Sequence, residues 1–244
     1  DVVESPAWDF EGLFLAHDNR LPLAVRLHSP LFEVMKIQGW AHTADLDLCI
    51  QLEGSLLRHA TAVYGSTNAI LDLVLQHYQL RPEVTARIPL GISLDAQTAP
   101  AAASRVKKIL FVGRLEPRKG IDVLLNALPG VLEKSPEAVV EIAGREIEQP
   151  GKVAKWLSAH PEWRLRVRAH GEVSDAQLRE LYSTCDLFVA PSIYESFGLI
   201  YLEAMAHGKA VIGTHAGGIP EVVAHNETGI LVPPGDSKAL AEAI

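Results

Sequence analysis

The carboxyl-terminal part of the chain alternates between short apolar runs and longer segments in which apolar residues recur every three or four positions. The short runs predict β-strands and the longer segments predict amphipathic helices. The predicted strands are Ile109–Val112, Ala138–Ala143, Leu165–Ala169, Leu187–Ala190, Ala210–Gly213 and Gly229–Val232. The predicted helices include Ile121–Glu133 and Asp175–Tyr182, and Ser174 with Gln177 forms a candidate capping box before the second. This order is typical of a parallel sheet with helices on both faces, which binds ligands at the carboxyl ends of its strands.

The first part of the chain shows the same alternation but yields fewer elements. The pattern predicts strands at Leu23–Leu27, Ala62–Gly65 and Thr85–Pro89, and helices at Asp45–His59 and Ala69–Tyr78. So few strands do not make an independent nucleotide-binding domain and would leave sheet edges exposed. We therefore expect residues 1–92 to be the latter half of an amino-terminal domain. Residues 93–105, rich in Ala, Pro, Thr and Ser, are predicted to be a linker, and residues 106–244 a second domain.

The composition is that of an ordinary globular protein and narrows the function classes. With 48% hydrophobic and 21% charged residues among 244, the chain can build a core. The net charge of −8 argues against nonspecific nucleic-acid binding, which needs a basic surface. Cys49 and Cys185 lack the spacing of a metal or redox pair and are expected to be core residues, which fits a reducing cytoplasm. No apolar run is long enough to span a membrane.

The chain has neither an initial methionine nor a helix stop signal at its end. The chain begins at Asp1 without a methionine, and it ends within the helix-like pattern 237–244, which has no stop signal. We therefore expect this sequence to be a fragment of a longer protein, whose targeting signals are not visible here.

One stretch, from Ala190 to Glu203, combines the features of an anion site. An apolar run stops at Pro191, a carboxylate follows at Glu195, and a helix is predicted to open near Ser196. A helix N-terminus receives an anion on its backbone N–H groups, and carboxylates beside it can hold hydroxyl groups. Phosphate together with hydroxyl groups suggests a nucleotide sugar. An isolated Glu is more often a solvated surface residue, but the apolar neighbours of Glu203 mean that its carboxylate needs a partner.

A second charged group follows the predicted strand Ile109–Val112, in a glycine-bounded loop that begins at Gly113. Arg114 and Lys119 in this loop could neutralise a diphosphate, Arg with a planar fork and Lys with a point charge. The alternative is a solvated basic turn, since Arg118 is also present and has no assigned role.

Several segments, in order along the chain, resemble those of the retaining glycosyltransferases with the GT-B fold, the group-1 or family-four enzymes. These segments are Asp1–Glu4, Arg26–Pro30, Gly113–Gly120, the Glu-x7-Glu signature from Glu195 to Glu203, Gly217–Glu221, Thr228–Val232 and Pro234–Asp236. A single Glu-x7-Glu arises easily by chance, whereas the ordered set covers nearly the whole chain and is specific. The resemblance implies an α/β fold of GT-B architecture. Two Rossmann-like domains would face a cleft, the first of them only partly present.

The resemblance also implies roles for single residues. The implied donor-binding residues are Gly113, Arg114, Lys119, Phe197, Gly198, Leu199 and Glu203, and the implied catalytic residues are Glu195, His28, Arg114 and Lys119. Arg114 and Lys119 would bind the donor diphosphate, while Glu203 would hold the ribose and Glu195 the donor sugar. His28 would lie across the cleft, near the reacting carbon, although a lone His is more often structural.

Asp45-Leu46-Asp47 spells the metal-binding Asp-x-Asp of GT-A glycosyltransferases. In those enzymes the tripeptide follows a strand, whereas here it lies within a predicted helix, so we interpret it as a solvated helix start favoured by the macrodipole. The other histidines show no metal-ligand spacing; they include His160, His170, His207, His215 and His225. No metal and no cofactor are expected, only the donor as substrate.

The expected function is metal-independent transfer of a sugar from a UDP- or GDP-linked donor to an acceptor hydroxyl, with retention of the anomeric configuration. The resemblance implies a front-face attack within an ion pair. The expected partners are a nucleotide sugar and a glycan, lipid or small-molecule acceptor, with no nucleic acid, in the cytoplasm or peripheral at a membrane. Two alternatives stay open: another GT-B nucleotide-sugar enzyme such as an epimerase, or a binding module without catalysis. The fragment by itself is expected to be inactive.

Overall fold

The computed structural model describes residues 1–18, 20–93, 107–146 and 151–244. Within it the chain forms two compact units, one of Asp1–Gly91 together with Glu195–Phe197, and one of Ile92–Tyr194 together with Gly198–Ile244. The predicted linker, residues 93–105, lies almost entirely outside the described residues. None of the described helices is both long and apolar enough to cross a bilayer.

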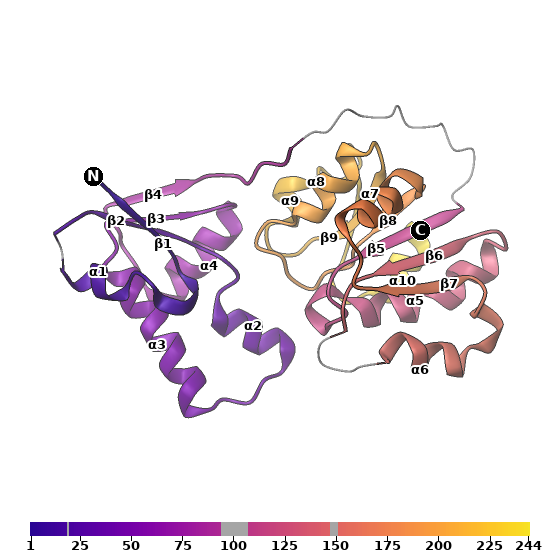
Figure 1. Ribbon diagram of the computed structural model, residues 1–244, viewed down its shortest axis with the longest axis horizontal. Coiled ribbons are helices and arrows are strands. Elements are labelled where there is room, and N and C mark those ends of the chain that lie inside the picture. The colour runs from indigo at the N-terminus through magenta and orange to yellow at the C-terminus, as the bar shows by residue number, and fades with distance from the viewer. Residues whose placement is uncertain (19, 94–106, 147–150) are drawn as a thin grey trace. The chain divides into compact units, whose positions relative to one another are not determined.

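The first unit contains a sheet of four parallel strands (Figure 1). In spatial order these are β1 (Val3–Pro6), β2 (Leu23–Arg26), β3 (Ala62–Gly65) and β4 (Val84–Arg87). The helices are α1 (Leu13–Asp18), α2 (Leu31–Gln38), α3 (Ala44–Arg58) and α4 (Asn68–Tyr78), with a short 3₁₀ turn at Trp8–Phe10. The sequence pattern placed β2, β3, β4, α3 and α4 to within a few residues and missed β1, α1 and α2.

Two helix starts in the first unit are set by threonine caps. The Thr43 hydroxyl accepts a hydrogen bond from the Leu46 backbone N–H, and the Thr67 hydroxyl accepts one from Ile70. Asp45 and Asp47 consequently lie in the first turn of α3, as the sequence pattern predicted, and not after a strand.

The second unit contains six parallel strands in the order β10-β9-β8-β5-β6-β7 (Figure 1). The strands are β5 (Lys108–Val112), β6 (Val139–Ala143), β7 (Val167–Gly171), β8 (Leu187–Val189), β9 (Ala210–Thr214) and β10 (Ile230–Val232). The helices are α5 (Ile121–Lys134), α6 (Lys152–Ala159), α7 (Asp175–Thr184), α8 (Leu199–Ala206), α9 (Ile219–Val222) and α10 (Ser237–Ala243), with 3₁₀ turns at Pro117–Lys119 and Pro161–Trp163. The chain runs outward from β5 to β7 and then returns to the other side of β5, so the order reverses between β5 and β8. Ligands of such sheets bind at this reversal.

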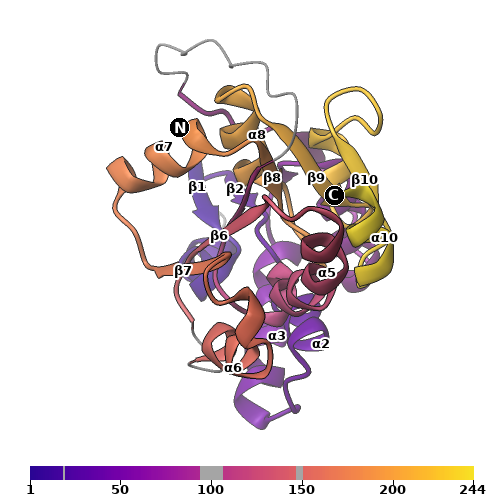
Figure 2. The same cartoon turned by 90° about the vertical axis from the view of Figure 1, so that its right-hand side faces the viewer.

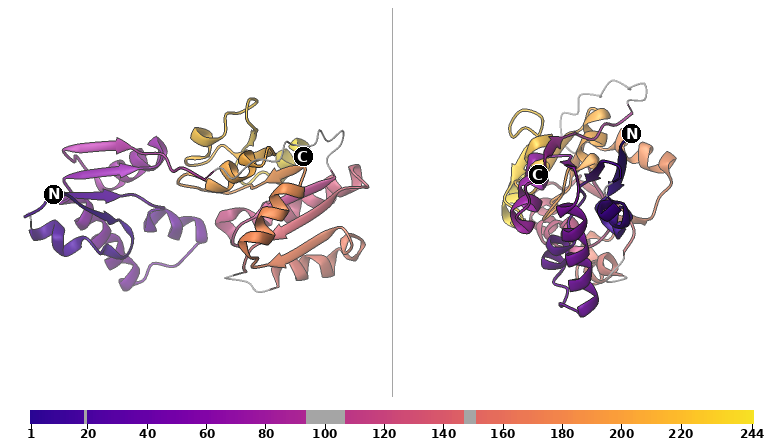
Figure 3. Two further views of the ribbon diagram at one scale, coloured as in Figure 1. Left: turned by 45° about the horizontal axis from the view of Figure 1, so that its top comes forward. Right: turned by 90° about the vertical axis from the view of Figure 1, so that its left-hand side faces the viewer.

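Helices cover both faces of the second sheet, as Figures 2 and 3 show. One core joins α5 and α10 to strand residues such as Ile109 and Phe111. The other joins α7, α8 and α9 to Leu110 and Phe188 on the opposite face. Neighbouring residues of β5 thus enter opposite cores, which explains why its sequence is apolar from Ile109 to Val112.

Local differences from the sequence pattern have physical causes. The strand predicted at Leu165–Ala169 begins two residues later, because the Arg166 backbone N–H donates to the Trp163 carbonyl of the preceding turn at 2.8 Å and Leu165 is exposed. The predicted capping box of Ser174 and Gln177 is present.

The two cysteines differ in burial. Cys185 is buried, as expected, and burial raises its pKa to about 11, whereas Cys49 is only half-buried.

Candidate functional site

The loop after β5 begins with a close approach between two backbone segments. The Gly113 N–H donates to the Ala143 carbonyl at the end of β6, at 3.0 Å. Gly144 then passes so near that a Cβ on it would overlap the Gly113 carbonyl, and its φ is +146°. Only glycine tolerates both conditions, so these residues fix the start of the loop at the carboxyl edge of the sheet.

A buried carboxylate organises the cations of this loop. Glu116 is 3% exposed, and one of its oxygens, Oε1, lies 3.0 Å from the guanidinium of Arg114 and 3.0 Å from that of Arg118. Arg118 is itself buried and also donates to the Tyr194 carbonyl at 3.3 Å. Arg118, which had no assigned role in the sequence, is therefore a structural tether, while the Arg114 side chain is 52% exposed.

Lys119 lies in the same loop as Arg114, as the sequence implied. It ends the 3₁₀ turn Pro117–Lys119, is half-buried, and its backbone N–H donates to the Glu116 carbonyl at 3.0 Å. The aliphatic part of its side chain runs beside Gly113, because a Cβ on Gly113 would lie 3.7 Å from Lys119 Cδ. The two predicted phosphate ligands thus share one loop.

The loop after β8 is locked to the loop after β5. Gly120 has a φ of +73°, and a Cβ there would overlap the Pro191 carbonyl. The Ile193 N–H donates to the Arg118 carbonyl at 2.8 Å, and the Thr214 hydroxyl donates to the Ser192 carbonyl at 2.6 Å. The two loops that flank the reversal between β5 and β8 are therefore held in a fixed relation by backbone contacts.

Helix α8 begins at Leu199, three residues later than the sequence suggested. Gly198, with a φ of +98°, precedes it as the N-cap and offers no side chain to the first amides. The first N–H groups of a helix have no acceptor within it and carry partial positive charge. The Tyr201 hydroxyl donates to the Ala190 carbonyl at 2.6 Å, so the first turn of α8 is anchored to the end of β8.

Glu203, one turn further along α8, has the partner that its apolar surroundings required. The buried Tyr182 hydroxyl donates to Glu203 Oε2 at 2.8 Å. Burial, followed by the charge of Glu203, raises the pKa of Tyr182, so the phenol stays protonated and remains a donor. The Tyr182 hydroxyl thus satisfies one of the two oxygens of this carboxylate.

The remaining predicted site residues, Glu195, Phe197 and His28, belong to the first unit. Glu195 and Phe197 are each 7% exposed and belong to the short segment that groups there. His28 follows β2 and is half-buried. Burial, and then the charge of Arg26, lower the pKa of His28, so its imidazole is neutral at neutral pH.

The sequence did not predict two residues that support the candidate site, Glu116 and Tyr182. The sequence pattern assigned no role to Glu116, and it placed Tyr182 only as the last residue of a predicted helix. The only signal for Tyr182 was that Glu203 needed a donor.

The Asp45-Leu46-Asp47 tripeptide is solvated. Asp47 pairs with Nδ1 of His42 at 2.8 Å, and both side chains are exposed. Among the described residues, no group of three or more His, Cys, Asp or Glu side chains is arranged to hold a metal ion.

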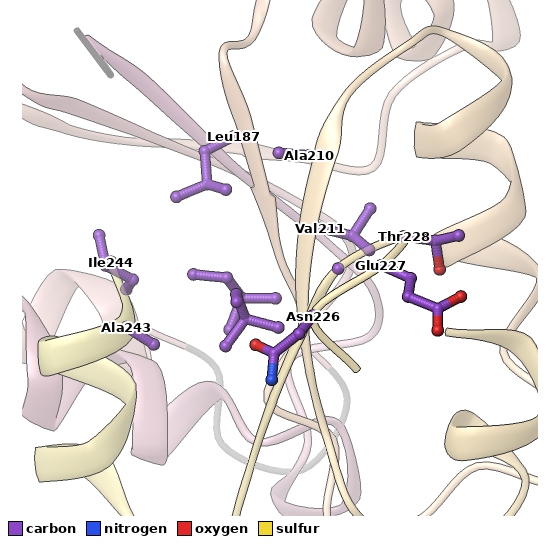
Figure 4. Close-up of a pocket in the computed structure, with 11 residues that line it drawn as sticks. Leu187, Ala210, Val211, Asn226, Glu227, Thr228, Ala243 and Ile244 are labelled. Atoms are coloured by element: carbon purple, nitrogen blue, oxygen red, sulfur yellow. The ribbon is translucent and has the colours of Figure 1, made fainter. Parts of the chain in front are cut away.

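A pocket of about 470 Å³ lies at the amino-terminal edge of the second sheet, opposite the edge that carries the two loops (Figure 4). Leu187 and Ala210, the first residues of β8 and β9, line it together with Asn226 and Ile244. Because parallel sheets bind ligands at the carboxyl ends of their strands, this pocket is separate from the candidate site.

Comparison with known proteins agrees with this geometry. A model of the family described as glycosyl transferases group 1 matches residues 96–244, more than half of the chain. The protein therefore belongs to the group-1 glycosyltransferases, and its parallel α/β sheets are those of the GT-B fold, as the sequence motifs implied.

Individual relatives extend over most of the chain. The protein is 40% identical over 164 residues to phosphatidyl-myo-inositol mannosyltransferase of Mycobacterium leprae, covering 64% of this chain and 42% of that protein. It is 39% identical over 259 residues to an uncharacterized glycosyltransferase of Methanocaldococcus jannaschii, covering 99% and 64%. The structure of HepE from Anabaena in complex with UDP-glucose matches with a TM-score of 0.79 and 25% identity, covering 99% of this chain and 67% of HepE. The chain thus spans only part of the length of these proteins.

Proposed function

We propose that the protein transfers a sugar from a UDP- or GDP-linked donor to an acceptor hydroxyl, with retention of configuration and without a metal ion. The observation that carries this proposal is the reversal between β5 and β8. There an exposed Arg114, Lys119 and the uncapped start of α8 come from two loops locked to each other. HepE, which shares this fold, is described in complex with UDP-glucose.

The chemical demand is the charge on the leaving group. The acceptor hydroxyl attacks the anomeric carbon on the face that the diphosphate leaves, the C–O bond to phosphate breaks, and the hydroxyl proton passes to the departing phosphate oxygen. Arg114 turns from Glu116 toward the diphosphate, and Lys119 and the amides of α8 stabilise the growing negative charge. Such fixed cations and dipoles do the work that a metal ion does in other transferases.

The carboxylates and His28 act on the rest of the donor in this proposal. Glu203, oriented by Tyr182, binds the ribose hydroxyls through its second oxygen. Glu195 holds the sugar where positive charge develops at the anomeric carbon, and the neutral imidazole of His28 bonds to a hydroxyl group near that carbon.

The test is whether the diphosphate preference depends on the two cations. Calorimetry should show that UDP or GDP binds more tightly than the matching nucleoside, with or without EDTA. Arg114→Ala combined with Lys119→Ala should remove most of that difference, since each charge-assisted contact contributes about 1.5–3 kcal/mol.

The matched control is Lys155→Ala combined with Arg164→Ala, which removes two exposed cations of the same unit outside both loops. A diphosphate preference that persists in the Arg114 and Lys119 double variant would refute the assignment. So would a preference that disappears with EDTA and returns with Mg²⁺.

A further inference from the structure

The connection between β2 and α2, residues 28–30, is short and has fixed ends. Before it, the Leu27 backbone N–H donates to the Tyr64 carbonyl of β3 at 2.8 Å. After it, α2 begins at Leu31, and the proline in its N-cap position forms no side-chain hydrogen bond to the first amides. The position of His28 in this connection therefore depends on what holds the first turn of α2.

A buried carboxylate from another helix holds that turn. Glu53 of α3 is 5% exposed and accepts a hydrogen bond from the Leu31 backbone N–H. This N–H group has no acceptor within its own helix, and a carboxylate beside it also meets the positive end of the helix macrodipole. Glu53 therefore supplies the N-terminal cap that the sequence of α2 lacks.

The Glu53 side chain is itself fixed by α4. The Tyr78 hydroxyl donates to Glu53 Oε2 at 2.8 Å. The Tyr78 ring packs directly against the backbone of α3, since a Cβ on Gly54 would lie only 2.8 Å from a ring carbon. Burial, followed by the charge of Glu53, raises the pKa of Tyr78, so its phenol stays protonated and remains a donor.

The second residue of α2 is also held by α4. The Phe32 ring stacks on His77 with ring centroids 3.5 Å apart, and it meets the edge of the Tyr78 ring at 5.7 Å. Burial, partly opposed by the charge of Glu33, lowers the pKa of His77, so its imidazole is neutral at neutral pH. The start of α2 is thus fixed by the backbone of Leu31 and by the ring of Phe32.

The charge of Glu53 does not stabilise the fold at neutral pH. Burial raises the pKa of Glu53, and the bonds from Tyr78 and Leu31 offset this only in part. A carboxyl whose pKa is higher in the folded chain than in the unfolded chain is held less well once it ionises. A buried charge without a gain in stability can instead fix one particular arrangement, and here the arrangement is the start of α2.

We propose that Glu53 is a positioning residue for His28. It is buried and acts through α2, because a connection of three residues cannot take up a displacement of the helix without moving the imidazole. The proposal rests on the proposed function, in which His28 bonds to a hydroxyl group near the reacting carbon.

NMR of the labelled histidine rings in the full chain tests the proposal, with His28→Gln to assign the His28 signals. Glu53→Met keeps the length of the side chain but removes the acceptor, so the start of α2 loses its cap. His28 should then become more exposed, and its lowered pKa should return toward the ordinary value. Glu53→Gln keeps one oxygen for the Leu31 N–H, so His28 should titrate as in the unaltered chain.

Stability and the position of His28 should respond differently to a second substitution. Glu53→Met leaves the buried Tyr78 hydroxyl without its acceptor, so the midpoint of urea denaturation should fall. Adding Tyr78→Phe removes that hydroxyl and should restore most of the lost stability, but it should not restore the pKa of His28. Recovery of both together would show that Glu53 acts only on folding and would overturn the proposal.

Glu141→Met is the matched control, because Glu141 is a carboxylate of the second unit and is 3% exposed. It should leave the His28 signals unchanged. If Glu53→Met does not fold, the unaltered chain still decides, since the Leu31 amide signal should shift as the Glu53 carboxyl titrates. The proposal is wrong if Leu31 does not respond to that titration, or if His28 titrates normally in a folded Glu53→Met variant.

Calorimetry with UDP and GDP separates this proposal from the donor site. Failure of the positioning role alone leaves nucleotide binding intact and sensitive to Arg114 and Lys119. Failure of the proposed function appears instead as absent or insensitive nucleotide binding, whatever the His28 signals do.

Discussion

The two sheets present their carboxyl edges in different ways. In the second unit the loops at this edge touch backbone to backbone, as Gly144 does with Gly113 and Gly120 with Pro191. In the first unit the edge is lined by side chains that project from the strands, notably Glu4, Arg26 and Tyr64. One edge is fixed by main-chain geometry and the other by the choice of side chains.

This difference bears on the proposed donor site, which lies at the edge of the second sheet. A diphosphate is common to many donors and is well bound by rigid amides and a few cations. An edge lined by side chains, by contrast, can change its lining without disturbing the backbone. We infer that substitutions in the second edge act first on folding, while substitutions in the first edge change stability less.

The largest expected effect is that of Gly120→Ala. A Cβ at Gly120 would overlap the Pro191 carbonyl, and the φ of +73° is unfavourable for alanine. Both loops would have to separate, so we expect a loss of about 4 kcal/mol or more in unfolding free energy, measured by urea denaturation.

Gly235→Ala is the control for backbone conformation alone. Gly235 has a similar φ of +80°, but nothing lies within 4 Å of an added Cβ. Its cost should be only about 1–2 kcal/mol. Equal losses in the two variants would mean that the contact between Gly120 and Pro191 contributes nothing.

A smaller effect distinguishes two arginines on the same carboxylate. Arg118→Ala removes a buried partner of the buried Glu116, and breaking such a pair costs about 3 kcal/mol. Arg114→Ala removes the half-exposed partner and should change stability by less than about 1 kcal/mol, while weakening UDP binding. The reverse order of stabilities in urea would exchange the roles of the two residues.

The sequence was sufficient for those parts of the molecule in which local pattern decides structure. Apolar runs located every strand of the second unit, and the central strands β5, β8 and β9 are apolar on both faces because they enter both cores. The capping box at Ser174 was predictable because it depends only on two residues that lie three positions apart. The family resemblance added the cation loop and the Glu-x7-Glu segment, which the structure places at the reversal of strand order.

The sequence was insufficient where contacts join distant segments. Arg118 and Arg114 are alike in the sequence, and only the fold shows that one is buried against Tyr194 and the other exposed. Tyr182 and Glu203 meet across two helices, and the polar face of the first sheet appears only once its register is known. The start of α8 was misplaced because Gly198 ends the irregular loop, and no side-chain cap marks that point.

The smallest expected effect compares two tyrosines that each donate to a glutamate. Tyr182 is 2% exposed and bonds to Glu203, so Tyr182→Phe leaves a partly buried carboxylate without its donor. We expect a loss of about 1 kcal/mol in urea denaturation. If Glu203 binds the ribose as proposed, the affinity for UDP should also fall several-fold, because Tyr182 no longer orients its carboxylate. Tyr64 bonds to Glu4 at a pocket open to solvent, so Tyr64→Phe should change stability by less than about 0.5 kcal/mol and leave UDP affinity unchanged. A larger loss of stability in Tyr64→Phe than in Tyr182→Phe would contradict the contrast between an edge fixed by main-chain contacts and an edge lined by side chains.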